Sequence, residues 1–155
     1  MKKIVFLGRG GAGKSTSARR LSETINVPLV ELDKVFWQPG LQPLGKEAWI
    51  TLQRELARKD EWIMDGDLGK YDVLSERLKY ADTVIILNFP LFTCAWRAFR
   101  RSSERLDFWW WLVTWRRVEL PKILKSVEQH APDAKLIILK NQRQLDQFLS
   151  ETEIR

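Results

Sequence analysis

The segment Gly8-Arg9-Gly10-Gly11-Ala12-Gly13-Lys14-Ser15 decides the fold, because it matches the pattern G-x-x-x-x-G-K-[ST] at every position. A short apolar run over residues 4–7 precedes it, and an amphipathic stretch with Ala18, Leu21 and Ile25 on one face follows it. The pattern therefore lies between an expected strand and an expected helix. In that context, backbone N–H groups wrap a phosphate, and the helix N-terminus adds positive partial charge.

The side chains of this loop (residues 8–15, the P-loop below) predict that it binds the phosphates of a nucleotide together with Mg²⁺. Lys14 can reach the β- and γ-phosphates, and the Ser15 hydroxyl can ligate Mg²⁺. The residues expected to bind the nucleotide here are Gly8, Gly10, Gly11, Ala12, Gly13, Lys14, Ser15 and Thr16.

Apolar runs and amphipathic stretches alternate along the rest of the chain. Further strands are expected at 28–32, 61–64, 83–87 and 135–139, with helices between them and a closing helix around Leu145. Residues 91–129 show a helical pattern that we expect to be interrupted near 104–110 and at Pro121. This alternation predicts an α/β fold with a doubly wound parallel sheet, in a single domain over residues 1–155.

The composition excludes several other classes of protein. The chain has 155 residues, of which 45% are hydrophobic and 30% charged, which suits one globular domain and excludes a disordered or repetitive chain. A single cysteine, Cys94, excludes an internal disulfide framework and fits a reducing compartment. The apolar stretch 108–113 is too short to span a bilayer. We therefore expect a cytoplasmic protein with no membrane partner.

Polar residues end three of the apolar runs, namely Asp33, Asp65 and Asn88. Because parallel strands end at the sheet edge that carries the P-loop, both aspartates are expected to face the γ-phosphate region. One carboxylate could hold Mg²⁺, and the other could accept the proton of an acceptor hydroxyl. The alternative is that these residues only cap the turns that follow. Motifs of a Ras-like GTPase are absent.

Six arginines lie between residues 97 and 117, within a net charge of +6. They are Arg97, Arg100, Arg101, Arg105, Arg116 and Arg117. We expect a helical lid over roughly 97–117 that closes on the triphosphate, with the solvated face of an amphipathic helix as the alternative. The Trp-rich segment 108–115, in the second half of this range, is expected to be core or a homodimer contact.

The order of motifs resembles the adenylate-kinase-related proteins known as DNA topology modulation proteins. After the P-loop, the residues that carry the resemblance are Leu32-Asp33, Trp37–Gly40, Trp62–Gly66, Ala81–Leu87, Pro90 and Cys94–Arg97 with Arg100-Arg101. The resemblance covers nearly the whole chain. It implies a nucleoside-monophosphate-kinase fold with a five-stranded parallel sheet, an acceptor-binding segment and an arginine lid.

The same resemblance implies roles for single residues. Arg97 and Arg101 are similar to paired lid arginines, one over the base and one on phosphate, and Lys140 would lie beside adenine. Since Asn88 stands where aspartate is commoner, the metal is expected on Ser15 and Asp65. Asp33 is then expected to orient or deprotonate the acceptor.

Two functions follow from these observations. The first is an ATP- and Mg²⁺-dependent kinase that phosphorylates a small acceptor, such as a nucleoside, nucleotide or other hydroxyl compound. The chain lacks an evident arginine for the phosphate of AMP, which makes AMP the weaker acceptor. The second is a nucleotide-dependent regulatory protein that binds nucleic acid, favoured by the basic charge. Nonspecific nucleic-acid binding that weakens with salt is expected in either case.

Overall fold

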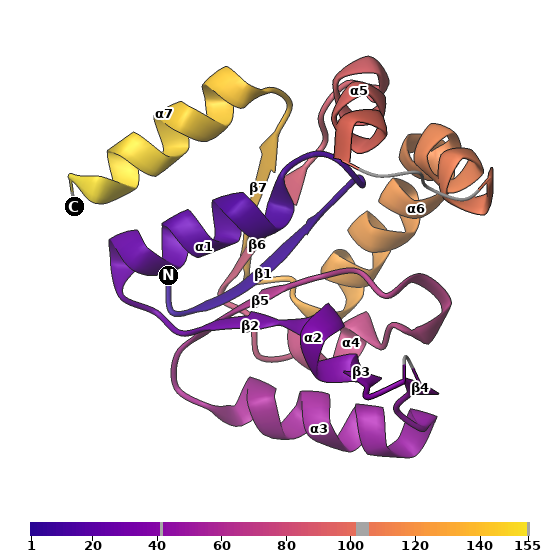
Figure 1. Ribbon diagram of the computed structural model, residues 1–155. Helices are drawn as coiled ribbons and strands as arrows, with labels where there is room; N and C mark the ends of the chain where they lie inside the picture. Colours follow the sequence, from indigo (N-terminus) through magenta and orange to yellow (C-terminus); the bar gives the residue numbers. More distant parts are fainter. Residues whose placement is uncertain (41, 102–105, 155) are drawn as a thin grey trace.

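The computed structural model describes residues 1–40, 42–101 and 106–154, apart from the side chains at 70 and 101. Its centre is a parallel five-stranded sheet in the order β2-β5-β1-β6-β7 (Figure 1). These strands are β1 (Lys3–Gly8), β2 (Leu29–Glu31), β5 (Trp62–Asp65), β6 (Thr83–Leu87) and β7 (Lys135–Leu139). The expected doubly wound α/β fold is confirmed. A small antiparallel pair, β3 (Trp37–Gln38) and β4 (Gln42–Pro43), lies beside it.

Helices cover both faces of the sheet. In chain order they are α1 (Lys14–Ile25), α2 (Leu32–Phe36), α3 (Lys46–Arg58), the 3-10 turn η1 (Gly69–Tyr71), α4 (Leu74–Leu78), α5 (Leu91–Arg101), α6 (Leu106–His130) and α7 (Gln142–Glu153). Helices α1 and α7 lie on one face, and α3, α4 and α6 lie on the other (Figure 1).

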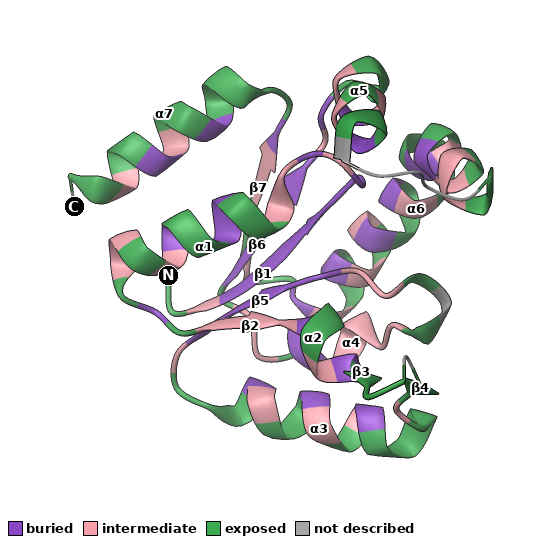
Figure 2. Cartoon of the chain, viewed as in Figure 1, coloured by how far each residue is buried: buried purple, intermediate pink, exposed green. Residues whose placement is uncertain are grey.

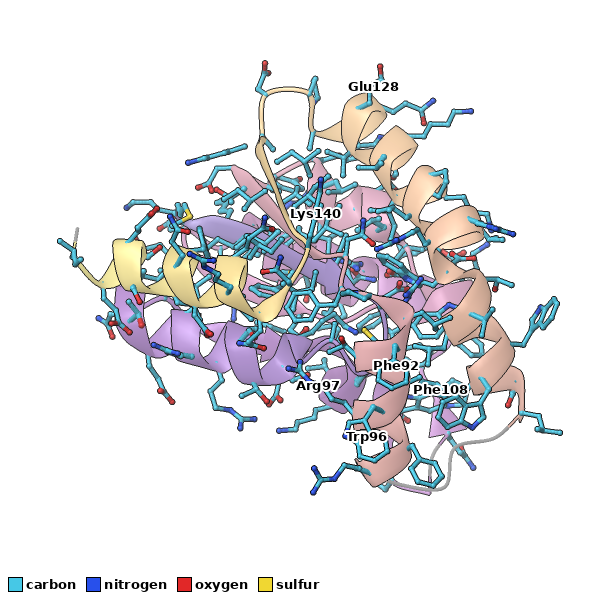
Figure 3. All side chains as sticks on the ribbon, turned by 90° about the horizontal axis from the view of Figure 1, so that it is seen from above. Phe92, Trp96, Arg97, Phe108, Glu128 and Lys140 are labelled. Atoms are coloured by element: carbon cyan, nitrogen blue, oxygen red, sulfur yellow. The ribbon has the colours of Figure 1, made fainter. Side chains whose placement is uncertain are left out.

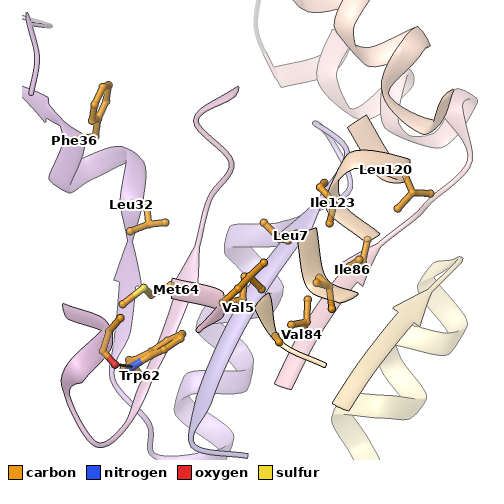
Figure 4. Close-up of a cluster of buried hydrophobic side chains, with 14 of the residues drawn as sticks. Val5, Leu7, Leu32, Phe36, Trp62, Met64, Val84, Ile86, Leu120 and Ile123 are labelled. Carbon is orange, nitrogen blue, oxygen red and sulfur yellow. Dashed lines mark hydrogen bonds between the residues drawn. The ribbon is translucent and has the colours of Figure 1, made fainter. Parts of the chain in front are cut away.

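The core is divided by the sheet into two layers. On β1, Val5 and Leu7 point into the layer under α3, α4 and α6, while Ile4 and Phe6 point into the layer under α1 and α7. Figures 2 and 4 show these buried strands and the first of the two clusters. Burial on both faces explains why the strands are continuous apolar runs. Each fully buried aliphatic side chain contributes about 1.5–3 kcal/mol.

The strand register brings the polar residues of the site to one edge. Phe6 pairs with Asp65 on one side of β1, and Gly8 pairs with Leu87 on the other. The P-loop, Asp65 and Asn88 therefore lie at the same edge of the sheet, as the pattern of strand ends predicted.

Two sequence-based expectations about element boundaries are wrong. The second strand ends at Glu31 and not at Leu32, so that Asp33 is the second residue of the short helix α2. Helix α6 also continues through Pro121 without a break. Pro121 is exposed, and so is Arg117, the residue whose carbonyl loses its helical hydrogen-bond donor at a proline.

The break expected near 104–110 has a counterpart in the end of α5 at Arg101 and the start of α6 at Leu106. The expected lid boundaries, 97–117, take in the end of α5 and the first half of α6. The rest of α6 packs in the core through Leu120 and Ile123. In the described part of the chain, no helix combines the length and the hydropathy needed to cross a membrane.

Candidate active site at the P-loop

The P-loop joins β1 to α1 in the geometry that its sequence predicts. Gly11 has a φ of +73°, which a residue with a side chain rarely adopts. Helix α1 begins at Lys14, and no described side chain caps its first turn. The first N–H groups of α1 are therefore open to an anion, and the helix dipole favours a negative charge there.

Two helices from the second half of the chain pack directly on the P-loop. A Cβ on Gly11 would lie 2.3 Å from the carbonyl oxygen of Cys94 in α5. A Cβ on Gly10 would lie 3.0 Å from the rings of Phe108 and Trp111 in α6. The glycines thus allow the close approach of α5 and α6 as well as that of a phosphate.

A cavity of about 590 Å³ opens between the P-loop and the start of α6. It is lined by Gly10, Gly11, Gly13, Lys14, Ser15, Thr16, Asp33, Asp65, Gly66, Asp67, Gly69, Asp107, Phe108 and Trp111. The cavity thus brings together Lys14, Ser15, Asp33 and Asp65, which the sequence singled out. Gly8 and Ala12, also expected to bind nucleotide, lie in the loop but do not line the cavity.

Charge inside this cavity is unevenly distributed. Desolvation raises the pKa of Asp33, and the carboxylates of Asp65 and Asp67 raise it further, against the opposing effect of Lys14. Burial likewise raises the pKa of Asp67, with a further contribution from Asp72. Among the described residues, Lys14 donates one long hydrogen bond of 3.4 Å, to the carbonyl of Arg9. Three carboxylates therefore share one nearby lysine.

Asp65 and Ser15 form the arrangement expected for a magnesium site. Burial raises the pKa of Asp65, while a hydrogen bond with Ser15 and the charge of Lys14 lower it less strongly. Asp65 is 3% exposed, and its Oδ1 has no hydrogen-bond partner in the described structure. An orphaned carboxylate oxygen beside a hydroxyl suits Mg²⁺, which takes few protein ligands and completes its shell with phosphate and water. No larger group of acidic, cysteine or histidine ligands occurs among the described residues.

Arg77 is a residue that the sequence analysis missed. It is fully buried and binds Asp72 through two hydrogen bonds of 2.6 and 2.8 Å. It also donates to Gln53 Oε1 and to the carbonyl of Gly66, each at 3.0 Å. Arg77 thereby fixes both ends of the loop that carries Asp67. An available signal was its position between Leu74 and Leu78, on the apolar face of the expected helix.

Arg97 lies on the other side of the P-loop. It donates to the carbonyl of Ala12 at 3.5 Å and to Gln142 Oε1 at 3.1 Å, and it lies over the ring of Phe89. Beside Arg97, between the starts of α5 and α7, lies a separate cavity of about 390 Å³ (the α5–α7 cavity below). It is lined by Phe89, Pro90, Thr93, Asn141, Gln142 and Arg143. Lys140 is exposed and does not line this cavity, and its side chain points away from Arg97 in the view of Figure 3.

The described arginines between residues 97 and 117 do not converge on the P-loop as a single group. Arg116 binds the side-chain oxygen of Asn88 at 3.0 Å. Arg9 is buried, donates to the carbonyl of Phe89 at 3.3 Å and lies over Trp115, so that it faces the core and not the cavity. The side chain of Arg101 and residues 102–105 lie outside the described structure. The predicted role of Arg101 therefore stays a prediction.

The Trp-rich segment 108–115 is divided between interior and surface. Leu112 and Trp115 are fully buried, whereas Trp110 is 73% exposed. On α5, the aromatic face of Phe92, Trp96 and Phe99 also points outward, at 82%, 56% and 70% exposure, because the small residues Cys94 and Ala98 fill the core side instead. The homodimer contact stays a prediction.

The sheet order, the P-loop and the helices on both faces define the fold of the P-loop kinases. The shikimate kinase from Acinetobacter baumannii in complex with shikimate has this fold, with a TM-score of 0.69 and 18% identity over 97% of this chain and 90% of that one. No protein-family model matches the chain.

Two curated kinases are similar in sequence. The shikimate kinase of Rhodococcus jostii is 33% identical over 101 residues, which is 57% of this chain and 60% of that protein. The adenylate kinase of Ruminiclostridium cellulolyticum is 33% identical over 93 residues, 57% of this chain and 40% of that protein. The chain thus spans less than two thirds of either relative. These relatives support the adenylate-kinase side of the resemblance, and DNA topology modulation stays a prediction.

Proposed function

We propose that this chain is a phosphotransferase that moves the γ-phosphoryl group of ATP to a hydroxyl group of a small acceptor. The observation that carries the proposal is the cavity that Lys14, Ser15, Asp33 and Asp65 share at the mouth of the P-loop. The two similar curated proteins are named as a shikimate kinase and an adenylate kinase, and they support the reaction class. Because these two names imply different acceptors, they leave the acceptor of this chain open.

The nucleotide would lie along the P-loop, with its phosphates on the first N–H groups of α1 and on Lys14. Arg97 would cover the nucleotide beside the α5–α7 cavity. Gln142, at the start of α7, would contact the base there. Ser15 and Asp65 would hold Mg²⁺, which when bound neutralises charge on the β- and γ-phosphates. The orphaned Oδ1 of Asp65 supports this assignment.

Asp33 faces this region from α2 and would act on the acceptor. Its carboxylate accepts the proton of the acceptor hydroxyl as the new bond forms between that oxygen and the γ-phosphorus. The bond from the γ-phosphorus to the β–γ bridging oxygen breaks, and ADP leaves. Lys14 neutralises the charge that develops on the transferred group, and Phe108 and Trp111 shield the reacting atoms from water.

The experiment compares Lys14→Ala with Lys46→Ala, an exposed lysine at the start of α3. Calorimetry with ATP and Mg²⁺ and an ADP-release assay over nucleosides, nucleotides, polyols and amino alcohols are run on both variants. We expect Lys14→Ala to lose ATP affinity and to reduce transfer by about 10²–10³-fold, while Lys46→Ala matches the unmodified chain. Unchanged ATP affinity in Lys14→Ala would contradict the proposal.

The nucleic-acid alternative predicts a different result in the same assays. Binding of DNA to a chain of net charge +6 should disappear between 50 and roughly 200 mM salt if it is nonspecific. DNA binding that persists at the higher salt, or ATP hydrolysis that DNA strongly stimulates, would favour the regulatory function over the kinase.

A further inference from the structure

A second cavity, of about 240 Å³, adjoins the P-loop cavity. The two share Asp67 and Gly69, which lie at the junction between them. The second cavity (the inner cavity below) has an apolar wall of Leu7, Leu74 and Ile123. Its volume equals roughly eight water molecules at about 30 Å³ each, which fits one end of a small organic molecule.

Carboxylates dominate the polar wall of the inner cavity. Two of them are already balanced by cations, since Asp72 is paired with Arg77 at 2.6 Å and Glu119 with Lys122 at 3.2 Å. Asp67 is different. Its Oδ1 accepts the N–H of Gly69 at 3.0 Å, and it has no ion-pair partner within the described parts of the chain. Of the three carboxylates that line the inner cavity, Asp67 is thus the one that can pair with a cationic group of a ligand.

The P-loop cavity points to a ligand independently. The buried Oδ1 of Asp65 has no partner there, and Lys14, the one cation that lines this cavity among the described residues, is committed to phosphate. With Lys14 taken up by phosphate, an acceptor that carries a carboxylate or a phosphate would meet the carboxylates of Asp33 and Asp67. Arg77, whose charge also acts on Asp67, is already bound to Asp72. Such an anion would be repelled, while a cation would be attracted.

We propose that the phosphate acceptor is a hydroxyl compound that carries a protonated amine, such as an amino alcohol or amino sugar, and that Asp67 binds the amine. The inference rests on the proposed function and names its substrate class. The ammonium group pairs with Asp67 at the junction, and any carbons that extend beyond the amine lie against Leu74 and Ile123 in the inner cavity. The hydroxyl end then reaches Asp33 in the P-loop cavity. A charge-assisted hydrogen bond to Asp67 supplies both affinity and orientation.

The test uses two acceptor series matched in carbon skeleton. The first is 4-amino-1-butanol, 1,4-butanediol and 4-hydroxybutyrate, and the second is glucosamine, glucose and gluconate. We expect kcat/KM for the amine to exceed that of its neutral and anionic counterparts by about 10- to 100-fold in at least one series. Asp67→Asn should remove this preference without changing ATP affinity, and Asp60→Asn, on an exposed turn, should preserve it.

The possible results separate this inference from the proposed function. Transfer that favours the neutral or anionic member of both series would overturn the amine assignment and still support a kinase. A preference for amines that survives in Asp67→Asn would also overturn the role of Asp67. If no member is phosphorylated, calorimetry with 4-amino-1-butanol in the presence of ADP and Mg²⁺ decides, and absence of binding there refutes the inference.

Discussion

The nucleotide end of the cavity comes from one segment, within residues 10–16, whereas the acceptor end comes from several separate segments. Asp33 belongs to α2, Asp67 to the loop after β5, and Phe108 and Trp111 to α6. The first end is defined by local backbone geometry. The second exists only because the sheet register and Arg77 bring distant segments together. A phosphate-binding loop can therefore be recognised in the sequence alone, whereas an acceptor site can be located only once the fold is known.

The largest effect that would sharpen this comparison is expected from Asp33→Asn. Removing a general base lowers phosphoryl transfer by about 10²–10⁴-fold, whereas ATP affinity should stay the same because Asp33 lies outside the P-loop. Steady-state kinetics and ATP calorimetry on the same preparation measure both quantities. Equal losses in the two measurements would show that Asp33 supports the structure of the site and not the transfer step.

Arg77→Ala is a second way to separate the two ends. It removes the side chain that fixes residues 66–72, the loop that carries Asp67, from its buried side. It leaves Asp72 without its buried partner and removes a donor from the carbonyl of Gly66. We expect the free energy of unfolding in urea to fall by about 3–5 kcal/mol. Arg54→Ala is the control, because Arg54 pairs with Glu76 at the surface and should cost at most about 1 kcal/mol. Similar losses in both variants would refute the anchoring role.

The smallest expected effect concerns Asp65, which lies between the two ends. Its pKa is raised in the folded chain by burial, so ionised Asp65 destabilises the fold. This destabilisation is absent below the unfolded pKa of about 3.9 and fully present once the pH exceeds the folded pKa. Asp65→Asn should therefore raise the Tm at neutral pH without ligand, by an amount that shrinks as the pH falls toward about 4.

Thermal unfolding of Asp65→Asn across this pH range, without nucleotide or Mg²⁺, makes the measurement. Asp60→Asn serves as the matched control, because Asp60 is exposed. A Tm gain that is independent of pH, or a loss at neutral pH, would show that the charge of Asp65 does not oppose folding.

Much of the fold could be predicted from the sequence, because the strands are continuous apolar runs and the P-loop is a local pattern. The grouping of Lys14 with Asp33 and Asp65 followed from the rule that parallel strands end at one edge. Even so, Asp33 reaches the cavity from helix α2 and not from a strand end. Strand β2 has only three residues, too few for its end to be located from the sequence.

What the sequence could not indicate depends on long-range packing. Arg77 was missed because its partner Asp72 and its burial are set by how the segment after β5 packs. The face of Phe92 and Trp96 is exposed, because the small residues Cys94 and Ala98 are buried on the other side of α5, with Cys94 against Gly11. Periodicity locates the faces of a helix but does not say which face the rest of the chain will cover.

The contact between Gly11 and the carbonyl of Cys94 has a consequence for how the motif would be inherited. Gly11 must be glycine for two independent reasons, its φ of +73° and the position of α5 above it. A descendant that had lost nucleotide binding would still need this glycine in order to fold. Lys14 has no comparable packing reason among the described residues, where its side chain donates a 3.4 Å hydrogen bond to the carbonyl of Arg9 and interacts electrostatically with Asp33 and Asp65. Among diverging descendants, the lysine and not the glycine would mark those that still bind nucleotide.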